Sequence, residues 1–110
     1  MNNVYIMSAN RSAIGGFGGT LKNHCPVDLG TLVAKEAIAR SGYEVNEVEH
    51  AVFGNVIHTE PRDMYVSRVI ALQSGMDKAS AALTVNRLCG SGLQAIVSAS
   101  QILMLGDASV

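Results

Sequence analysis

Three short apolar runs alternate with three helical patterns along the chain, and this alternation limits the folds that it can adopt. The predicted strands are residues 4–9, 48–57 and 83–88. The predicted helices are residues 26–41, 64–74 and 90–105. Strands that alternate with helices usually form parallel sheets with right-handed crossovers. The sequence therefore predicts an α/β fold of order βαβαβα, with helices flanking a mostly parallel sheet.

The third predicted helix is apolar or small on nearly every side, which is the pattern of a helix buried all round. A parallel sheet also needs helices on both faces, and three strands cannot supply that cover. Residues 107–110 resemble the start of a fourth strand, and no linker or repeat divides the chain. We therefore expect residues 1–110 to be one domain that is truncated on its C-terminal side.

The composition argues against several classes of function. The chain is 48% hydrophobic and 15% charged, its formal net charge is -1, and it has no run of Lys or Arg that would bind nucleic acid. Its uninterrupted apolar stretches are four or five residues long, whereas a membrane span needs about 20. The N-terminus lacks the pattern of a signal peptide. We expect no nucleic-acid partner, no membrane partner and a cytoplasmic location.

Cys89 is placed at the predicted turn from the third strand into the third helix. A thiolate there would face the positive end of the helix dipole, which favours the ionised nucleophile. Gly90 and Gly92 remove side chains around the sulfur, and the Cys89 N–H could donate to a developing oxyanion. The same pattern also fits an inert buried cysteine, with glycines that only permit tight packing. The residues alone leave both interpretations open.

A family resemblance favours the nucleophile. Residues 86–96, Asn-Arg-Leu-Cys-Gly-Ser-Gly-Leu-Gln-Ala-Ile, resemble the acyl-cysteine motif of the thiolase family. The segment that follows this motif in the family is similar to residues 106–108. The family's first loop is similar to residues 11–15, and its second strand is similar to residues 53–56. Residues 59–65 resemble those of bacterial broad-specificity β-ketothiolases. The resemblance implies the first half of a thiolase N-terminal domain.

The resemblance also implies an activity. In this family a cysteine, here Cys89, attacks a thioester or 3-ketoacyl-CoA, holds the acyl group and passes it on in a condensation or a thiolysis. Acyl-CoA and coenzyme A would be substrates, no separate cofactor would be needed, and the full-length protein would be a homodimer or tetramer. The family's activating His, second Cys and further His belong to later motifs that are absent from this sequence. Only Cys89, as nucleophile and oxyanion donor, is carried over, and we expect the 110 residues alone to be inactive.

Two other functions remain open. A ketoacyl synthase also uses an acyl cysteine on a thiolase fold, although the Cys-Gly-Ser-Gly run favours a thiolase. A non-catalytic lipid-binding or assembly module could retain the thiolase-like half-domain without its chemistry. Thiol reactivity distinguishes that module from an enzyme, because a catalytic cysteine ionises more readily than an ordinary one.

The remaining candidate residues carry weaker signals. The Gly-rich residues 15–19 lack the P-loop Lys and Ser/Thr, so we predict a mobile loop. His58 follows the second predicted strand and could serve as a base for Cys89, while the role of Arg87 stays open. Cys25 is interpreted as a loop thiol, with a disulfide to Cys89 as a minor alternative. His24 and His50 have no partner at metal-ligand spacing, and no metal site is predicted.

Overall fold

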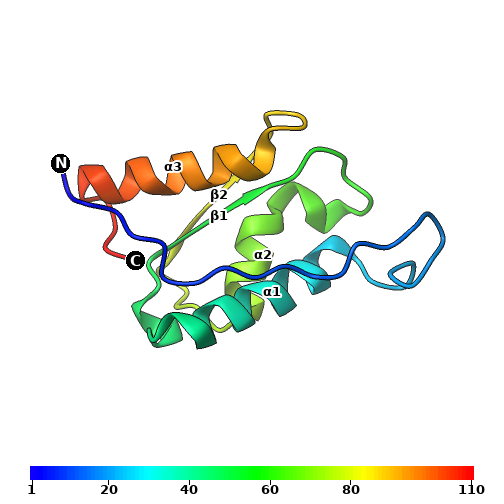
Figure 1. The fold of residues 1–110 in the computed structure, drawn as a ribbon, viewed down its shortest axis with the longest axis horizontal. Coiled ribbons are helices and arrows are strands. Elements are labelled where there is room, and N and C mark those ends of the chain that lie inside the picture. The colour runs from blue at the N-terminus through cyan, green and yellow to red at the C-terminus, as the bar shows by residue number, and fades with distance from the viewer.

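The computed structural model describes residues 1–110 as a small α/β unit in layers. Its elements are α1 (Pro26–Ser41), the 3-10 helix η1 (Val45–Glu47), β1 (His50–Gly54), the 3-10 helix η2 (Pro61–Tyr65), α2 (Val66–Gln73), β2 (Ala81–Val85) and α3 (Ser91–Leu105). Figure 1 shows α3 on one side of the two strands and α2 on the other, with α1 packed outside α2. This arrangement confirms the predicted α/β class.

The sheet consists of β1 and β2, which run parallel with His50 opposite Ala81 and Gly54 opposite Val85. The connection between them contains η2 and α2, so it is the helical crossover that parallel strands require. β1 lies inside the predicted strand 48–57, whereas β2 begins and ends earlier than the predicted strand 83–88. It ends early because the chain turns at Asn86, whose Oδ1 accepts the Leu88 N–H at 3.0 Å.

The first predicted strand, residues 4–9, is wrong. These residues form no strand, and Figure 1 shows the N-terminal segment running lengthwise beside α1. Ser8 Oγ donates to the Ala37 carbonyl at 2.7 Å, and Asn10 Nδ2 donates to the Val33 carbonyl at 3.1 Å. An apolar run becomes a strand only beside a partner strand, and these contacts attach it to a helix instead. Residues 107–110, the predicted fourth strand, are also irregular.

Glycine and proline mark the helix ends as predicted. Pro26 occupies the first turn of α1, and Gly42 follows it with a φ of 84°. Gly106 ends α3 with a φ of 81°. The predicted helix 64–74 differs, because its N-terminal part belongs to η2 and only Val66–Gln73 is α-helical. In η2 the Asp63 carboxylate accepts the backbone N–H of Glu60 at 3.2 Å, which stabilises the tighter turn.

The core consists of two small clusters on either side of Phe53. The first contains Val27, Val66 and Ile70, the second contains Ala51, Ala71 and Met76, and Phe53 packs against both. A buried serine of α2, Ser67, links these clusters to the sheet. Its Oγ accepts the Phe53 N–H at 3.0 Å and donates to the Leu83 carbonyl at 2.7 Å. The hydroxyl therefore joins α2 to both strands at once.

The prediction that α3 is buried on every side is not met within residues 1–110. Only Ser91 and Ala95 of α3 are buried, whereas the side chains of Leu93 and Leu105 are 69% and 74% exposed. By length and composition alone, the segment Leu88–Leu105 could cross a membrane, with a mean hydropathy of 1.5. Small polar residues divide this segment into short apolar runs at little cost in mean hydropathy, so the length of uninterrupted runs does not reveal it. Core helices of soluble proteins pass the same test, so it is weak evidence for a span.

The start of α3 lies directly against the end of β1. A Cβ added at Gly54 would approach the carbonyl carbon and oxygen of Ser91 to 2.7 Å each. Real Cβ atoms do not come so close, and the atoms in the way belong to the backbone, which cannot rotate aside. The contact that seats α3 on the sheet therefore depends on the missing side chain at Gly54.

We predict that Gly54→Ala destabilises the protein by about 1–3 kcal/mol, the usual cost of overpacking. Gly92→Ala is the matched control, since nothing lies within 4 Å of its added Cβ and it stands in the first turn of α3. The control is expected to be neutral or more stable by up to about 1 kcal/mol, from helix propensity. Denaturant unfolding of both variants measures the difference, and equal stabilities would show that the close approach is not a constraint.

Candidate active site

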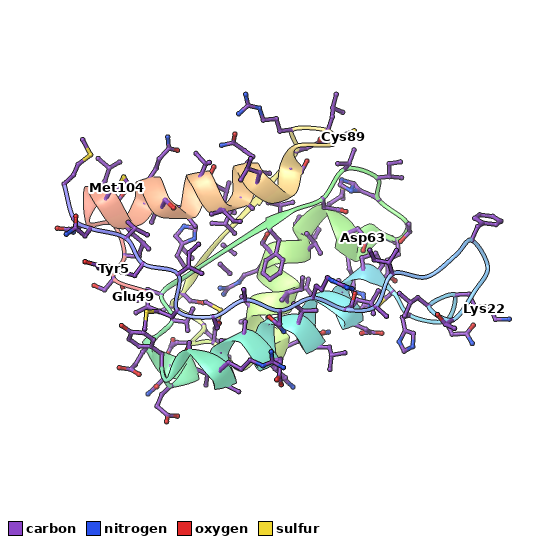
Figure 2. The ribbon with its side chains drawn as sticks, in the orientation of Figure 1. Tyr5, Lys22, Glu49, Asp63, Cys89 and Met104 are labelled. Atoms are coloured by element: carbon purple, nitrogen blue, oxygen red, sulfur yellow. The ribbon has the colours of Figure 1, made fainter.

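Cys89 lies in the turn between β2 and α3, as the sequence predicts, and its side chain is an exposed free thiol. Figure 2 shows it where the turn enters α3, at the same end of the molecule as Asp63 and opposite Met104. Gly90 and Gly92, which flank the turn, meet no side chain within 4 Å of an added Cβ. The sulfur is therefore open to a bulky reactant within residues 1–110, where Cys89 is exposed rather than buried.

The turn is held by hydrogen bonds around Leu88. Leu88 is the only residue other than glycine with a positive φ, at 50°. Its carbonyl accepts the Ser91 hydroxyl at 2.7 Å and the Ser91 N–H at 3.1 Å. The same hydroxyl accepts the Arg87 N–H at 2.8 Å, and the Gly90 N–H donates to the Arg87 carbonyl at 3.1 Å. These bonds occupy most of the polar backbone groups of the turn.

The backbone N–H groups of Cys89, Gly92 and Leu93 take no part in the hydrogen bonds of the turn or of α3. Free N–H groups at a helix start carry the positive end of the helix dipole and stabilise nearby negative charge. Cys89 carries one of these free N–H groups itself and has no carboxylate in hydrogen-bond contact. At the Cys89 N–H the arrangement offers a donor to an oxyanion on a bound acyl group.

His58 does not contact Cys89. Its Nδ1 lies 3.1 Å from Nδ2 of Asn55, and its side chain is exposed. Asn55 also donates its backbone N–H to the Val85 carbonyl at 3.0 Å, which ties the loop after β1 to the end of β2. The structure therefore places His58 at the same sheet edge as Cys89 but bonded to Asn55, and it supplies no geometry for a base.

Asp63 organises that loop, and sequence reasoning missed it. Its side chain is fully buried, and its Oδ2 accepts the Thr59 N–H and the Thr59 hydroxyl at 2.7 Å each. The bonds from the Thr59 backbone and hydroxyl lower the pKa of Asp63, against the opposing effect of burial. Glu60 and Asp63 have capping-box spacing on either side of Pro61, and this signal could have identified the turn.

The second cysteine, Cys25, precedes α1 and is half-buried. The Asp28 N–H lowers its pKa, but the Asp28 carboxylate, burial and Glu60 outweigh that bond and leave the pKa of Cys25 raised. Arg62 Nη2 donates to its sulfur at 3.5 Å. Both cysteines are free thiols, so the minor alternative of a Cys25–Cys89 disulfide is not formed.

The other candidates lie apart from this turn. The guanidinium of Arg87 contacts Gln94 one turn into α3, and Arg87 has no further partner that would assign it a role. Residues 15–19 form a turn in which the Gly19 N–H donates to the Gly16 carbonyl at 2.9 Å, and Phe17 is fully exposed. His24 is exposed, and His50 is half-buried at the start of β1.

Comparison with known proteins finds one family. Residues 4–110 match the family described as "Thiolase, N-terminal domain". The chain is 58% identical over 107 residues to the β-ketothiolase BktB of Cupriavidus necator, covering 97% of this chain and 27% of that protein. It is 36% identical to the mitochondrial 3-ketoacyl-CoA thiolase of Bos taurus, covering all of this chain and 28% of the relative. The chain thus spans about a quarter of the length of these curated relatives.

Solved structures give the same result. The acetyl-CoA acetyltransferase of Bacillus anthracis superimposes with a TM-score of 0.88 at 40% identity, over 94% of this chain and 26% of that one. The human mitochondrial 3-ketoacyl-CoA thiolase in complex with CoA superimposes with a TM-score of 0.82 at 36% identity, over 86% of this chain and 24% of that one. At these identities the likeness extends from the fold to the sequence.

We predict that iodoacetamide alkylates Cys89 at least about tenfold faster than Cys25 near neutral pH, because thiolate character and access control the rate. Cys89 is exposed beside free N–H groups, whereas Cys25 is half-buried with a raised pKa. Cys25→Ser and Cys89→Ala each leave one thiol, so mass spectrometry of the two variants separates the rates. Equal rates would contradict the expected difference in access and in the pKa of Cys25.

We also predict that Asp63 makes the free energy of unfolding depend on pH in the acidic range. Because folding lowers the pKa of Asp63, its stabilising effect is present above the unfolded value of about 3.9 and is lost as pH falls towards the folded value. Asp63→Asn should therefore be less stable than the wild type at pH 7, and the gap should narrow below about pH 4. Asp107→Asn, an exposed carboxylate without a side-chain hydrogen bond, is the control. A gap for Asp63→Asn that stays constant with pH would refute the linkage.

Proposed function

The chain belongs to the thiolase family, and on that premise we propose that the protein is an acyltransferase in which Cys89 carries the acyl group. The observation that supports this most is the exposed Cys89 thiol in a turn whose N–H groups at the start of α3 lack acceptors. A structural cysteine needs neither exposure nor free donors, whereas an acyl carrier needs both.

We infer the substrate class from the relatives. They are named as a β-ketothiolase, 3-ketoacyl-CoA thiolases and acetyl-CoA acetyltransferases, and two of the solved thiolase structures hold CoA. By that analogy the substrates are coenzyme A thioesters, and the reaction is thiolysis of a 3-ketoacyl-CoA or the reverse condensation of acetyl-CoA with an acyl-CoA. The 58% identity to a β-ketothiolase favours that branch of the family.

In the proposed first half-reaction, the Cys89 thiolate attacks the thioester carbonyl carbon of an acyl-CoA such as acetyl-CoA, or the 3-keto carbon of a 3-ketoacyl-CoA. A bond forms between that carbon and Sγ, and the carbonyl oxygen takes negative charge that the Cys89 N–H can stabilise. Collapse of this intermediate breaks the bond from carbon to the leaving group. Coenzyme A leaves from acetyl-CoA and takes up a proton, whereas the α-carbanion of acetyl-CoA leaves from a 3-ketoacyl-CoA and is protonated. In the second half-reaction the acceptor, either coenzyme A deprotonated at sulfur or acetyl-CoA deprotonated at its α-carbon, attacks the acyl carbon. The bond from that carbon to Sγ breaks, and Cys89 leaves as the thiolate.

The proton transfers need groups that these 110 residues do not provide. His58 is bonded to Asn55, and no other imidazole is in contact with the turn of Cys89. We propose that the activating His and the second Cys of the family come from sequence beyond these residues, and that residues 1–110 alone do not turn over. We further propose that the full-length protein is a homodimer or tetramer, as the family resemblance implies.

The test is acylation of the full-length protein by acetyl-CoA, read by peptide mass spectrometry. The expected result is one acetyl group on the peptide that contains Cys89, its loss in Cys89→Ala, and its retention in Cys25→Ser. Acetylation that persists in Cys89→Ala would overturn the assignment. A full-length protein that binds acetyl-CoA but never forms an acyl enzyme would instead be the non-catalytic binding module.

A further inference from the structure

We propose that Ser91 is a positioning residue for acyl transfer at Cys89, because its hydroxyl fixes the peptide group that joins Leu88 to Cys89. This inference rests on the proposed function of Cys89 as acyl carrier. Ser91 is buried, with 5% of its surface exposed, and its backbone lies against Gly54 of β1. Because the Ser91 side chain is buried and not exposed beside the sulfur, it acts on Cys89 through the backbone of the turn.

The conformation of Leu88 needs such support. A φ of 50° is unfavourable for any residue with a Cβ, and leucine has no side-chain group to compensate for it. Packing does not hold it there, since the Leu88 side chain is 69% exposed. What remains is hydrogen bonding, with the Leu88 N–H donating to Asn86 Oδ1 at 3.0 Å and its carbonyl accepting two bonds from Ser91.

The link to chemistry is the planarity of the peptide bond. The Leu88 carbonyl and the Cys89 N–H belong to one trans peptide group, so they point in opposite directions and move together. The Ser91 hydroxyl pulls the carbonyl towards the start of α3 at 2.7 Å. The Cys89 N–H is thereby directed away from the acceptors of the helix and has no partner in the chain. Ser91 thus keeps free the one donor assigned to the acyl oxygen.

The hydroxyl also closes the turn from its other side. While it donates to the Leu88 carbonyl, it accepts the Arg87 N–H at 2.8 Å. One buried oxygen therefore bridges Arg87, the residue before the left-handed φ, and the carbonyl of Leu88 itself. Removing it leaves the Arg87 N–H without a partner and leaves the Leu88 carbonyl held only by the Ser91 N–H at 3.1 Å.

The experiment compares two reactions of Cys89 in the full-length protein. Acylation by acetyl-CoA, followed in a single turnover, uses the oxyanion donor, whereas alkylation by iodoacetamide needs only the thiolate. Ser91→Ala should slow acylation by about 10- to 100-fold, because a misplaced reacting group or donor has effects of this size. Alkylation should change by less than about threefold, since it depends on thiolate character and access.

Ser100→Ala is the matched control. Its hydroxyl also bonds a backbone carbonyl of α3, that of Ile96 at 2.8 Å, but it lies away from the turn. It should leave both rates unchanged. A merely structural role of Ser91 would alter acylation and alkylation alike, and would overturn the proposal, as would acylation of Ser91→Ala within about twofold of the wild type.

A rescue sharpens the test. Glycine adopts a positive φ without steric cost and alanine does not, so Leu88→Gly should restore acylation in the Ser91→Ala background and Leu88→Ala should not. If Ser91→Ala is insoluble, Leu88→Val and Leu88→Gly are compared instead, in a protein that retains Ser91. A β-branched residue resists this positive φ at an exposed site, so Leu88→Val should acylate more slowly than Leu88→Gly. Equal acylation within either pair would contradict the proposal. A wild type that never acylates at Cys89 would instead refute the proposed function.

Discussion

The close approach of Ser91 to Gly54 is the constraint on which the rest of the site depends. It seats the first turn of α3 on the end of β1, and α3 in turn fixes the residues just before it, including Cys89. Because β1 and β2 are parallel, their carboxyl ends share one edge, and Asn55 joins the loop after β1 to Val85 at that edge. Because Gly54 of β1 has no side chain, the start of α3 can lie against it, and this packing determines where the Cys89 thiol is exposed.

The two cysteines occupy similar positions in the fold but have different surroundings. Each precedes a helix, so each is near the positive end of a dipole. Cys25 has the carboxylates of Asp28 and Glu60 beside it, and the net effect is a raised pKa. Cys89 has glycines and unpaired N–H groups instead. The same helical feature therefore accompanies a thiol with a raised pKa in one place and a candidate nucleophile in the other.

Local signals in the sequence predicted those parts of the fold that depend on local chemistry. Pro26 and Gly42 located α1, and the Cys-Gly-Ser-Gly run located the turn of Cys89 and the family. Residues 4–9 were wrongly predicted as a strand, because an apolar run does not reveal whether a partner strand or a helix lies beside it. The roles of Asp63 and Ser91 were missed for a similar reason. They depend on a buried turn and on a contact with Gly54, which appear only once the chain is folded.

The central claim is that the turn holds both the nucleophile and a donor for the acyl oxygen on adjacent atoms of Cys89. A crystal structure of the full-length protein trapped with an acetyl group tests it most directly. The account predicts the acetyl carbon bonded to Sγ of Cys89, with its carbonyl oxygen about 2.7–3.1 Å from the Cys89 nitrogen, the range expected for an oxyanion donor. An acetyl group on another residue, or one whose oxygen points away from that nitrogen, would contradict the account.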